Sequence, residues 1–163
     1  MSVKPINIGV VGVGHLGIHH VKHYTTIPNV NLLGIYDPDV KRSNYVAKKY
    51  RTVPFQSLKK LIENVDALSI VTPTSNHYKT AKLCIENKKH VFIEKPITVT
   101  LKEANKLLDL SKNNSTIIQV GHIERLNPAL MALEPYYINP KFIEIQRLAP
   151  YTSRGTDVPV VLD

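Results

Sequence analysis

A glycine-rich turn between an apolar run and a helix constrains the fold of this chain more than any other feature. Residues Ile6–Val13 form a short run rich in valine and isoleucine, which is typical of a strand buried on both faces. The run leads into Gly12-Val13-Gly14-His15-Leu16-Gly17, a G-x-G-x-x-G pattern, and residues His15–Ile27 carry apolar side chains at helical spacing. A strand, this turn and a helix in succession predict the start of a β-α-β unit.

Strand-like and helix-like patterns then alternate as far as Val120. The expected strands are Ile6–Val13, Asn31–Tyr36, Val53–Phe55, Ala67–Val71, His90–Ile93 and Thr116–Val120. The expected helices are His15–Ile27, one that opens at Asp37-Pro38, Ser57–Asn64, Ser75–Asn87 and Leu101–Ser111. This rhythm predicts the α/β class, with a doubly wound parallel sheet and helices on both faces.

The rhythm changes after Gly121. A helix is expected from Asn127-Pro128 through Glu134, and residues Lys141–Leu148 alternate between apolar and polar side chains like a half-exposed antiparallel strand. We therefore expect one domain over residues 1–121 and the beginning of a second, incomplete unit over residues 122–163. A piece this short rarely folds alone. An unpaired strand edge over residues 141–148 would invite association between copies, so a homo-oligomer is expected.

Composition excludes several classes of protein. The chain has 163 residues and a single cysteine, which excludes a disulfide framework and a multi-thiolate zinc site. No apolar run approaches the length of a membrane helix, and without a targeting signal we expect a cytoplasmic protein. The net charge of +8 would suit nucleic acid, but the basic residues are spread over several helix-like segments, so no nucleic-acid partner is expected. His15, His19 and His23 share a helix face without a carboxylate or cysteine, and no metal site is predicted.

The glycine turn has the chemistry of a dinucleotide site. Gly12 permits a tight turn, Gly14 lets the backbone approach a pyrophosphate, and Gly17 lets helix and strand pack closely. His15 and Leu16 lie in the same turn, where the start of the helix offers free N–H groups to phosphate oxygens. The alternative is a glycine turn without a ligand.

Asp37 ends the second expected strand, twenty residues after Gly17. A carboxylate at this place accepts hydrogen bonds from the adenosine ribose and repels a 2′-phosphate, which favours NAD over NADP. Asp37 is also a good helix N-cap, which is the alternative interpretation. The nearby Lys41 and Arg42 could weaken the preference for NAD.

Two more motifs follow strands and are therefore expected at the same sheet edge. They are Thr72-Pro73-Thr74-Ser75-Asn76-His77 and Glu94-Lys95-Pro96. Lys95 could donate a hydrogen bond to a substrate hydroxyl or to the cofactor, or it could be a surface lysine before a turn proline.

The three motifs together, with His90-Val91 before Glu94, resemble the Gfo/Idh/MocA oxidoreductases over the whole chain. The resemblance implies an N-terminal Rossmann domain that binds NAD(P), here residues 1–121, and a C-terminal α/β domain that binds a sugar or polyol. Residues 122–163 would be the beginning of this substrate domain in truncated form. It implies that Thr72, Pro73, Thr74 and His77, together with Glu94, Lys95 and Pro96, line the cofactor. It also implies that Lys95 is catalytic, beside the nicotinamide and the substrate, often with a cis peptide before Pro96.

The later residues narrow this resemblance. Gly121–Ala129 and Arg147–Asp163 resemble the UDP-N-acetylglucosamine 3-dehydrogenase branch, whose enzymes oxidise the sugar 3-hydroxyl to a ketone, often on a route to an amide-linked lipid A. The substrate residues expected from it are Lys95, His122, Arg125, Asn127 and Arg154. The arginines suit a UDP diphosphate, although they could equally be surface residues.

The family's general base is the histidine of an Asp-x-x-x-His helix in the second domain. Asp163 would match the start of that motif, and the sequence given ends there. Two hypotheses follow: the cofactor half of an NAD-dependent sugar or sugar-nucleotide oxidoreductase, or a non-catalytic dinucleotide-binding module that lacks the histidine.

Overall fold

The architecture is one twisted sheet of six parallel strands in the order β3-β2-β1-β4-β5-β6. It is seen in a computed structural model that describes residues 4–136, 138–146 and 148. The strands are β1 (Ile6–Val11), β2 (Val30–Tyr36), β3 (Val53–Pro54), β4 (Ala67–Ile70), β5 (His90–Ile93) and β6 (Ile118–Val120). The order reverses between β1 and β4, as in doubly wound dinucleotide-binding folds, so the predicted fold class is confirmed.

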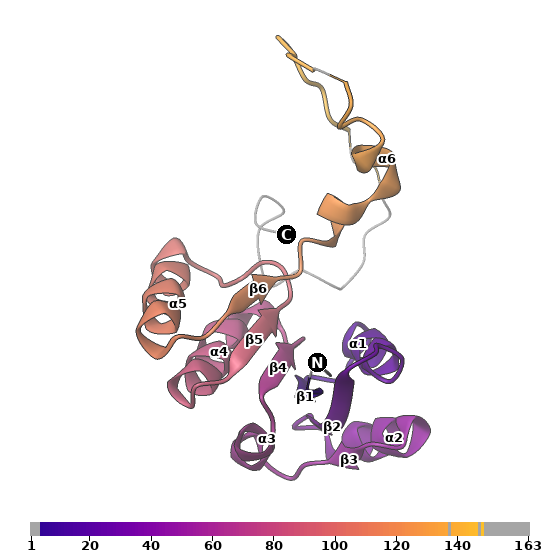
Figure 1. Cartoon of the computed structure of the whole chain (residues 1–163), viewed down its shortest axis with the longest axis vertical. Coiled ribbons are helices and arrows are strands. Elements are labelled where there is room, and N and C mark those ends of the chain that lie inside the picture. Colours follow the sequence, from indigo (N-terminus) through magenta and orange to yellow (C-terminus); the bar gives the residue numbers. More distant parts are fainter. Residues whose placement is uncertain (1–3, 137, 147, 149–163) are drawn as a thin grey trace.

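Helices cover both faces of the sheet (Figure 1). They are α1 (Gly17–Tyr24), α2 (Val40–Tyr50), α3 (Leu58–Asn64), α4 (His77–Glu86), α5 (Leu101–Asn114) and α6 (Pro128–Met131), with 3₁₀ turns η1 (Thr74–Asn76) and η2 (Ile123–Leu126). The starts of α2, α3 and α5 are fixed by side chains of Asp39, Ser57 and Thr100, each of which accepts a backbone N–H three residues further on.

Two separate cores hold these layers together. On one face, Val21 of α1 and Val46 of α2 pack against Val10 and Ile35 of the sheet. On the other face α3, α4 and α5 close over β4 and β5, with fully buried residues such as Leu61, Cys84, Ile85 and Leu107. The central strands are thus buried on both sides, which explains their nearly continuous apolar sequence.

Three predicted helix starts were wrong, for local reasons. The first helix begins at Gly17 rather than His15, because His15 and Leu16 belong to the turn. The second is capped by Asp39 and not by Asp37. The fourth begins at His77, because the residues before it form the 3₁₀ turn η1.

The chain changes character after β6 and extends away from the sheet (Figure 1). The helix expected through Glu134 ends at Met131 and gives way to turns, in which Glu134 N–H bonds to the Met131 carbonyl. The expected strand Lys141–Leu148 is wrong: its described residues, 141–146 and 148, form no strand. Alternation alone does not make a strand, and no neighbouring strand within the described residues pairs with this segment. Arg147, Arg154 and Asp163 lie outside the described residues.

The division into domains at residue 121 stays a prediction. Within the described ranges, no helix combines the length and the apolar character that crossing a bilayer requires.

Candidate functional site

Three loops meet at the carboxyl edge of the sheet, around the point where the strand order reverses. The glycine turn follows β1, the loop with Thr72 and His77 follows β4, and the loop with Glu94 and Lys95 follows β5. All strands are parallel, so all three loops lie at the same edge. Open α/β sheets bind ligands at this place.

The glycine turn is packed tightly on one side and open on the other. Gly12 has a φ of +86°, and a Cβ there would lie 2.6 Å from the Val71 carbonyl oxygen at the end of β4. A Cβ on Gly17 would overlap the Gly12 carbonyl oxygen. Around Gly14 no atom lies within 4 Å of an added Cβ. The turn therefore presents bare backbone, at the start of α1, to whatever occupies the crevice.

Asp37 is buried and holds the glycine turn against the end of β2. Its Oδ2 accepts the Val13 N–H at 2.9 Å, and its Oδ1 accepts the Asp39 N–H at 2.9 Å. The alternative interpretation of Asp37 as a helix N-cap is therefore wrong. Arg42 lies nearby, with Nη1 at 3.7 Å from Asp37 Oδ2 and Nη2 at 3.2 Å from Asp39 Oδ2. The end of β2 thus carries two carboxylates and one guanidinium.

A pocket of about 360 Å³ lies beside Asp37, between α2 and the ends of β2 and β3. Ser43, Asn44, Phe55 and Gln56 are among its lining residues. It contains none of the residues of the glycine turn or of the Thr72 and Lys95 loops. No sequence pattern pointed to this pocket, because its walls come from three elements, none of which carries a binding motif of its own.

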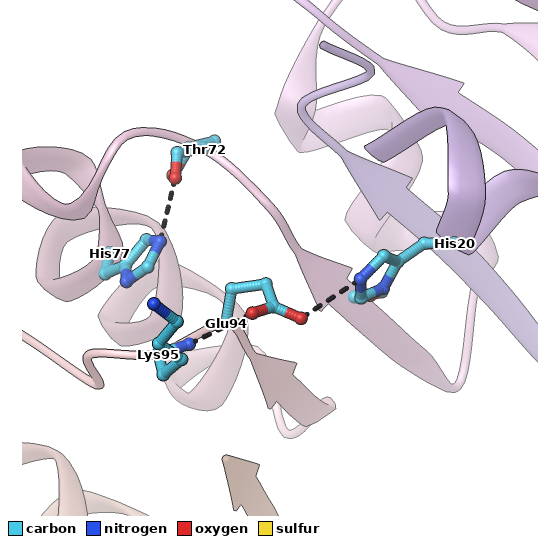
Figure 2. A network of polar contacts seen from close by, with 6 residues as sticks. His20, Thr72, His77, Glu94 and Lys95 are labelled. Carbon is cyan, nitrogen blue, oxygen red and sulfur yellow. Dashed lines mark hydrogen bonds and ion pairs between the residues drawn. The ribbon is translucent and has the colours of Figure 1, made fainter. Parts of the chain in front are cut away.

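His77 ties the loop after β4 to the loop after β5. Its side chain is buried, and its Nε2 lies 2.8 Å from the Thr72 carbonyl oxygen (Figure 2). Its Nδ1 lies 2.9 Å from the Pro96 carbonyl oxygen. Carbonyl oxygens only accept, so each contact is a hydrogen bond when the facing ring nitrogen carries a proton. The Lys95–Pro96 peptide is cis, as the family resemblance implied.

Glu94 points away from Thr72 and His77, toward α1 (Figure 2). Its Oε1 lies 3.1 Å from His20 Nε2, and the other ring nitrogen of His20, Nδ1, lies 2.9 Å from Ser69 Oγ. Burial raises the pKa of Glu94, but the hydrogen bond and charge of His20, and the N–H and charge of Lys95, outweigh it and leave that pKa below its ordinary value.

His20 and Ser69 were missed by the sequence analysis, which weighed His15, His19 and His23 instead. The signal was present: His20 lies three residues after Gly17 and directly before Val21, both buried, and so on the side of α1 that faces the sheet. Among the described residues, no group of three histidine, cysteine, aspartate or glutamate side chains could hold a metal ion.

Three of the predicted substrate residues, His122, Arg125 and Asn127, follow β6. Asn127 caps α6 through Oδ1, which accepts the Ala129 N–H at 2.9 Å, and its Nδ2 donates to Glu124 Oε2 at 2.7 Å. His122 and Arg125 are exposed in the same segment. His122 directly follows Gly121. A Cβ added to Gly121 would lie 2.9 Å from Glu94 Oε1, so the end of β6 lies beside the loop that follows β5.

Comparisons with known proteins agree with this geometry. The Gfo/Idh/MocA family model, described as "Oxidoreductase family, NAD-binding Rossmann fold", matches residues 6–122. The UDP-N-acetylglucosamine 3-dehydrogenase of Acidithiobacillus ferrooxidans is 38% identical over 156 residues, which are 95% of this chain and 49% of that protein. The scyllo-inositol 2-dehydrogenase (NAD(+)) of Bacillus subtilis is 35% identical over 130 residues, 76% of this chain and 37% of that protein.

Solved structures lead to the same fold. That of the Acidithiobacillus ferrooxidans enzyme superposes with a TM-score of 0.90 at 36% identity, covering 99% of this chain and 53% of that one. GenD2 from gentamicin A biosynthesis, in complex with NAD, superposes with a TM-score of 0.78 at 21% identity over 82% of this chain and 39% of that one, which is a likeness of fold alone. The chain spans about half the length, or less, of the curated relatives it matches.

Proposed function

Because the chain belongs to the Gfo/Idh/MocA oxidoreductase family and carries its NAD-binding Rossmann domain, we propose that it is the cofactor half of an NAD-dependent sugar or sugar-nucleotide dehydrogenase. The observation that carries this proposal is the meeting of the glycine turn, the Thr72–His77 loop and the Glu94–Pro96 loop at one sheet edge. Each loop alone is a common feature of α/β proteins, but their combination is that of a dinucleotide crevice.

The residues present fit a dinucleotide. The backbone around Gly14 is open, while a side chain at Gly12 or Gly17 would collide with backbone atoms. The N-terminus of α1, with His15 and Leu16 before it, offers N–H groups to the pyrophosphate. When bound, NAD would accept or return a hydride at its nicotinamide, and the protein would supply placement and electrostatics.

We propose NAD as the preferred cofactor over NADP. The support is Asp37, a buried carboxylate at the end of β2, where it would meet the adenosine ribose. A second carboxylate, that of Asp39, lies 3.2 Å from Arg42 and partly neutralises the one nearby guanidinium. A 2′-phosphate would thus face two carboxylates and a guanidinium that is already close to both of them.

For the substrate we propose UDP-N-acetylglucosamine, oxidised at its 3-hydroxyl. The support is the relative with this activity that matches 95% of the chain. In this proposal Lys95 donates a hydrogen bond to the reacting hydroxyl, and His122, Arg125, Asn127 and Arg154 contact the sugar nucleotide. Hydride transfer also needs a base for the hydroxyl proton, which we assign to a histidine of the substrate domain.

The test begins with the 163-residue chain. We expect saturable binding of NADH by fluorescence titration, with NADPH at least several-fold weaker. Absence of binding by either would contradict a cofactor site formed by these residues alone. Oxidation by a longer gene product is then assayed with NAD and either UDP-N-acetylglucosamine or scyllo-inositol as substrate. If NAD is reduced with neither of these substrates, the result would favour the alternative, a dinucleotide-binding module without catalysis. A cytoplasmic location and a homo-oligomer stay predictions.

A further inference from the structure

A chain of polar groups runs beneath the loops from α1 through β4 to the end of β5. Ser69 Oγ of β4 lies 2.9 Å from His20 Nδ1, and His20 Nε2 lies 3.1 Å from Glu94 Oε1. Glu94 Oε2 in turn accepts the backbone N–H of Lys95 at 3.3 Å. Figure 2 shows the Glu94 carboxylate between the His20 ring and Lys95. His20 is thus linked through one side chain to the residue proposed to act on the substrate.

The partners fix which ring nitrogen of His20 carries a proton. An ionised carboxylate only accepts, so Nε2 donates to Glu94. In the neutral ring Nδ1 is then an acceptor, and the Ser69 hydroxyl supplies the hydrogen. Ser69 is fully buried and the ring packs edge-on against Phe92, with centroids 5.6 Å apart. The ring is therefore held in place on three sides, and its donor is aimed at Glu94.

Glu94 owes its charge to these neighbours. Burial alone favours the protonated carboxylic acid, and the hydrogen bond from His20 is the largest effect that opposes burial. The ionisable groups that interact with Glu94 within the described ranges are His20 and Tyr24 of α1 and Lys95 at the end of its own strand. Ser69 on β4 and Gly121 after β6 add no charge. Removal of the His20 donor would therefore leave burial opposed mainly by the backbone N–H and the charge of Lys95.

The place of Glu94 in the sheet gives this charge a consequence. A dinucleotide lies across the reversal of strand order, with one mononucleotide on each half of the sheet. Asp37 is on the half formed by β1, β2 and β3, so the adenosine belongs there and the nicotinamide over β4, β5 and β6. Glu94 directly follows β5, in the second half. The oxidised nicotinamide ring carries a positive charge that the reduced ring lacks.

We propose that His20 is a positioning residue that holds Glu94 as an oriented anion beside the nicotinamide end of the site, so that the pair favours oxidised over reduced cofactor. This inference rests on the proposed function, because it needs a nicotinamide dinucleotide in the crevice. It adds a role for His20 and makes Glu94 an electrostatic element that faces α1.

The test compares NAD⁺ and NADH binding to variants of the 163-residue chain. In His20→Leu the donor is lost, and we expect the ratio of the NAD⁺ to the NADH dissociation constant to rise roughly three- to tenfold. The rise should grow as the pH is lowered, because without the His20 donor the Glu94 carboxylate takes up a proton more readily. His20→Gln keeps an N–H donor and should restore the ratio. His23→Leu, on the exposed side of the same helix, is the matched control and should leave it unchanged.

Glu94→Gln makes the proposal testable even if His20→Leu does not fold. It should raise the same ratio at every pH, and His20→Gln added to it should change nothing further. Equal weakening of NAD⁺ and NADH in His20→Leu, or an unchanged ratio in Glu94→Gln with binding intact, would overturn the inference alone. Failure of the unaltered chain to bind either form would overturn the proposed function as well.

Discussion

The carboxylate of Asp37 accepts the backbone N–H of Val13 at 2.9 Å, so the end of β2 and the glycine turn form one unit. The other oxygen of the same carboxylate accepts the N–H of Asp39, the residue at which the next helix, α2, is capped. A single buried side chain thereby positions the turn for the pyrophosphate and offers its charge where the ribose would lie. Structural and binding roles are combined in one residue, and substitutions must be chosen to separate them.

The preference for NADH over NADPH should fall when Asp37 loses its charge. Asp37→Asn keeps an oxygen for the Val13 N–H but no longer repels a 2′-phosphate, and Arg42 stays 3.7 Å from this position. We expect the preference, measured as the ratio of dissociation constants, to fall by roughly tenfold. Asp39→Asn is the control, since asparagine also caps helices, and it should change the preference by less than about twofold. An unchanged preference in Asp37→Asn would show that Asp37 does not discriminate between NADH and NADPH at the adenosine ribose.

The sheet could be predicted from the sequence because each strand is marked by its own residues. Runs such as Ile6–Val11 and Ala67–Ile70 are predominantly apolar, and glycine, proline or asparagine separates them from the helices. The doubly wound class followed from the alternation of strands and helices together with the glycine turn. Local sequence and global fold agree in this part of the chain.

The errors occurred where a choice depends on a distant partner. Asp37 and Asp39 are both good helix caps, and only the nearness of Val13 in space makes Asp37 a part of the glycine turn. The place of His20 beside Val21 put it on the sheet side of its helix, but its partners Ser69 and Glu94 come from two other strands and could not be identified from the helix alone. The segment 141–148 has the alternation of a strand, but a strand also needs a neighbour to pair with.

Substitution by alanine should have different effects on stability at Gly14 and at Gly17. In Gly17→Ala the new Cβ overlaps the Gly12 carbonyl oxygen, so the turn must shift and we expect a loss of about 3 kcal/mol in the free energy of unfolding. In Gly14→Ala no atom lies within 4 Å of the new Cβ, and the fold should be retained. Urea denaturation of both variants measures the difference. NADH affinity should nonetheless fall in Gly14→Ala, because the new methyl group would stand where the pyrophosphate approaches. Equal losses of unfolding free energy in the two variants would contradict this account.

His77 should stabilise the two loops that it joins. In His77→Leu the Thr72 and Pro96 carbonyl oxygens lose their partner inside the protein, and we expect the free energy of unfolding to fall by about 2 kcal/mol. NADH binding should weaken as well, since the loops after β4 and β5 are no longer tied together. The exposed His23→Leu serves as the control for loss of a histidine. If His77→Leu were as stable as that control, the link between the two loops would not contribute to the free energy of unfolding.

Cys84 should make stability fall in alkaline solution. Burial raises the pKa of its thiol from 9.0 to about 12, so between these values the unfolded chain releases a proton that the folded chain keeps. The unfolded state then binds fewer protons, and stability falls with rising pH by up to ~1.4 kcal/mol per pH unit. Below pH 9 the thiol is neutral in both states and has no effect. Tyrosines and lysines titrate in the same range, so the effect of the thiol is measured as a difference between two proteins. The free energies of unfolding of the parent and of Cys84→Ala are compared by urea denaturation across this range. Parallel pH curves for the two proteins would rule out this role for the thiol.

Copies of this chain should associate through the apolar segment that follows β6. Phe142 and Ile145 are 82% and 85% exposed, and Leu126 and Leu130 are also exposed in the same part of the chain. An apolar surface of this extent is unusual on an isolated domain and favours contact with another surface. Sedimentation at increasing concentration should therefore give a rising average mass, and Phe142→Lys with Ile145→Lys should lower it. The control is Tyr45→Lys, which replaces an exposed aromatic residue on α2 and should leave the association unchanged. A mass equal to that of one chain at all concentrations would show that this segment does not bind its own copy.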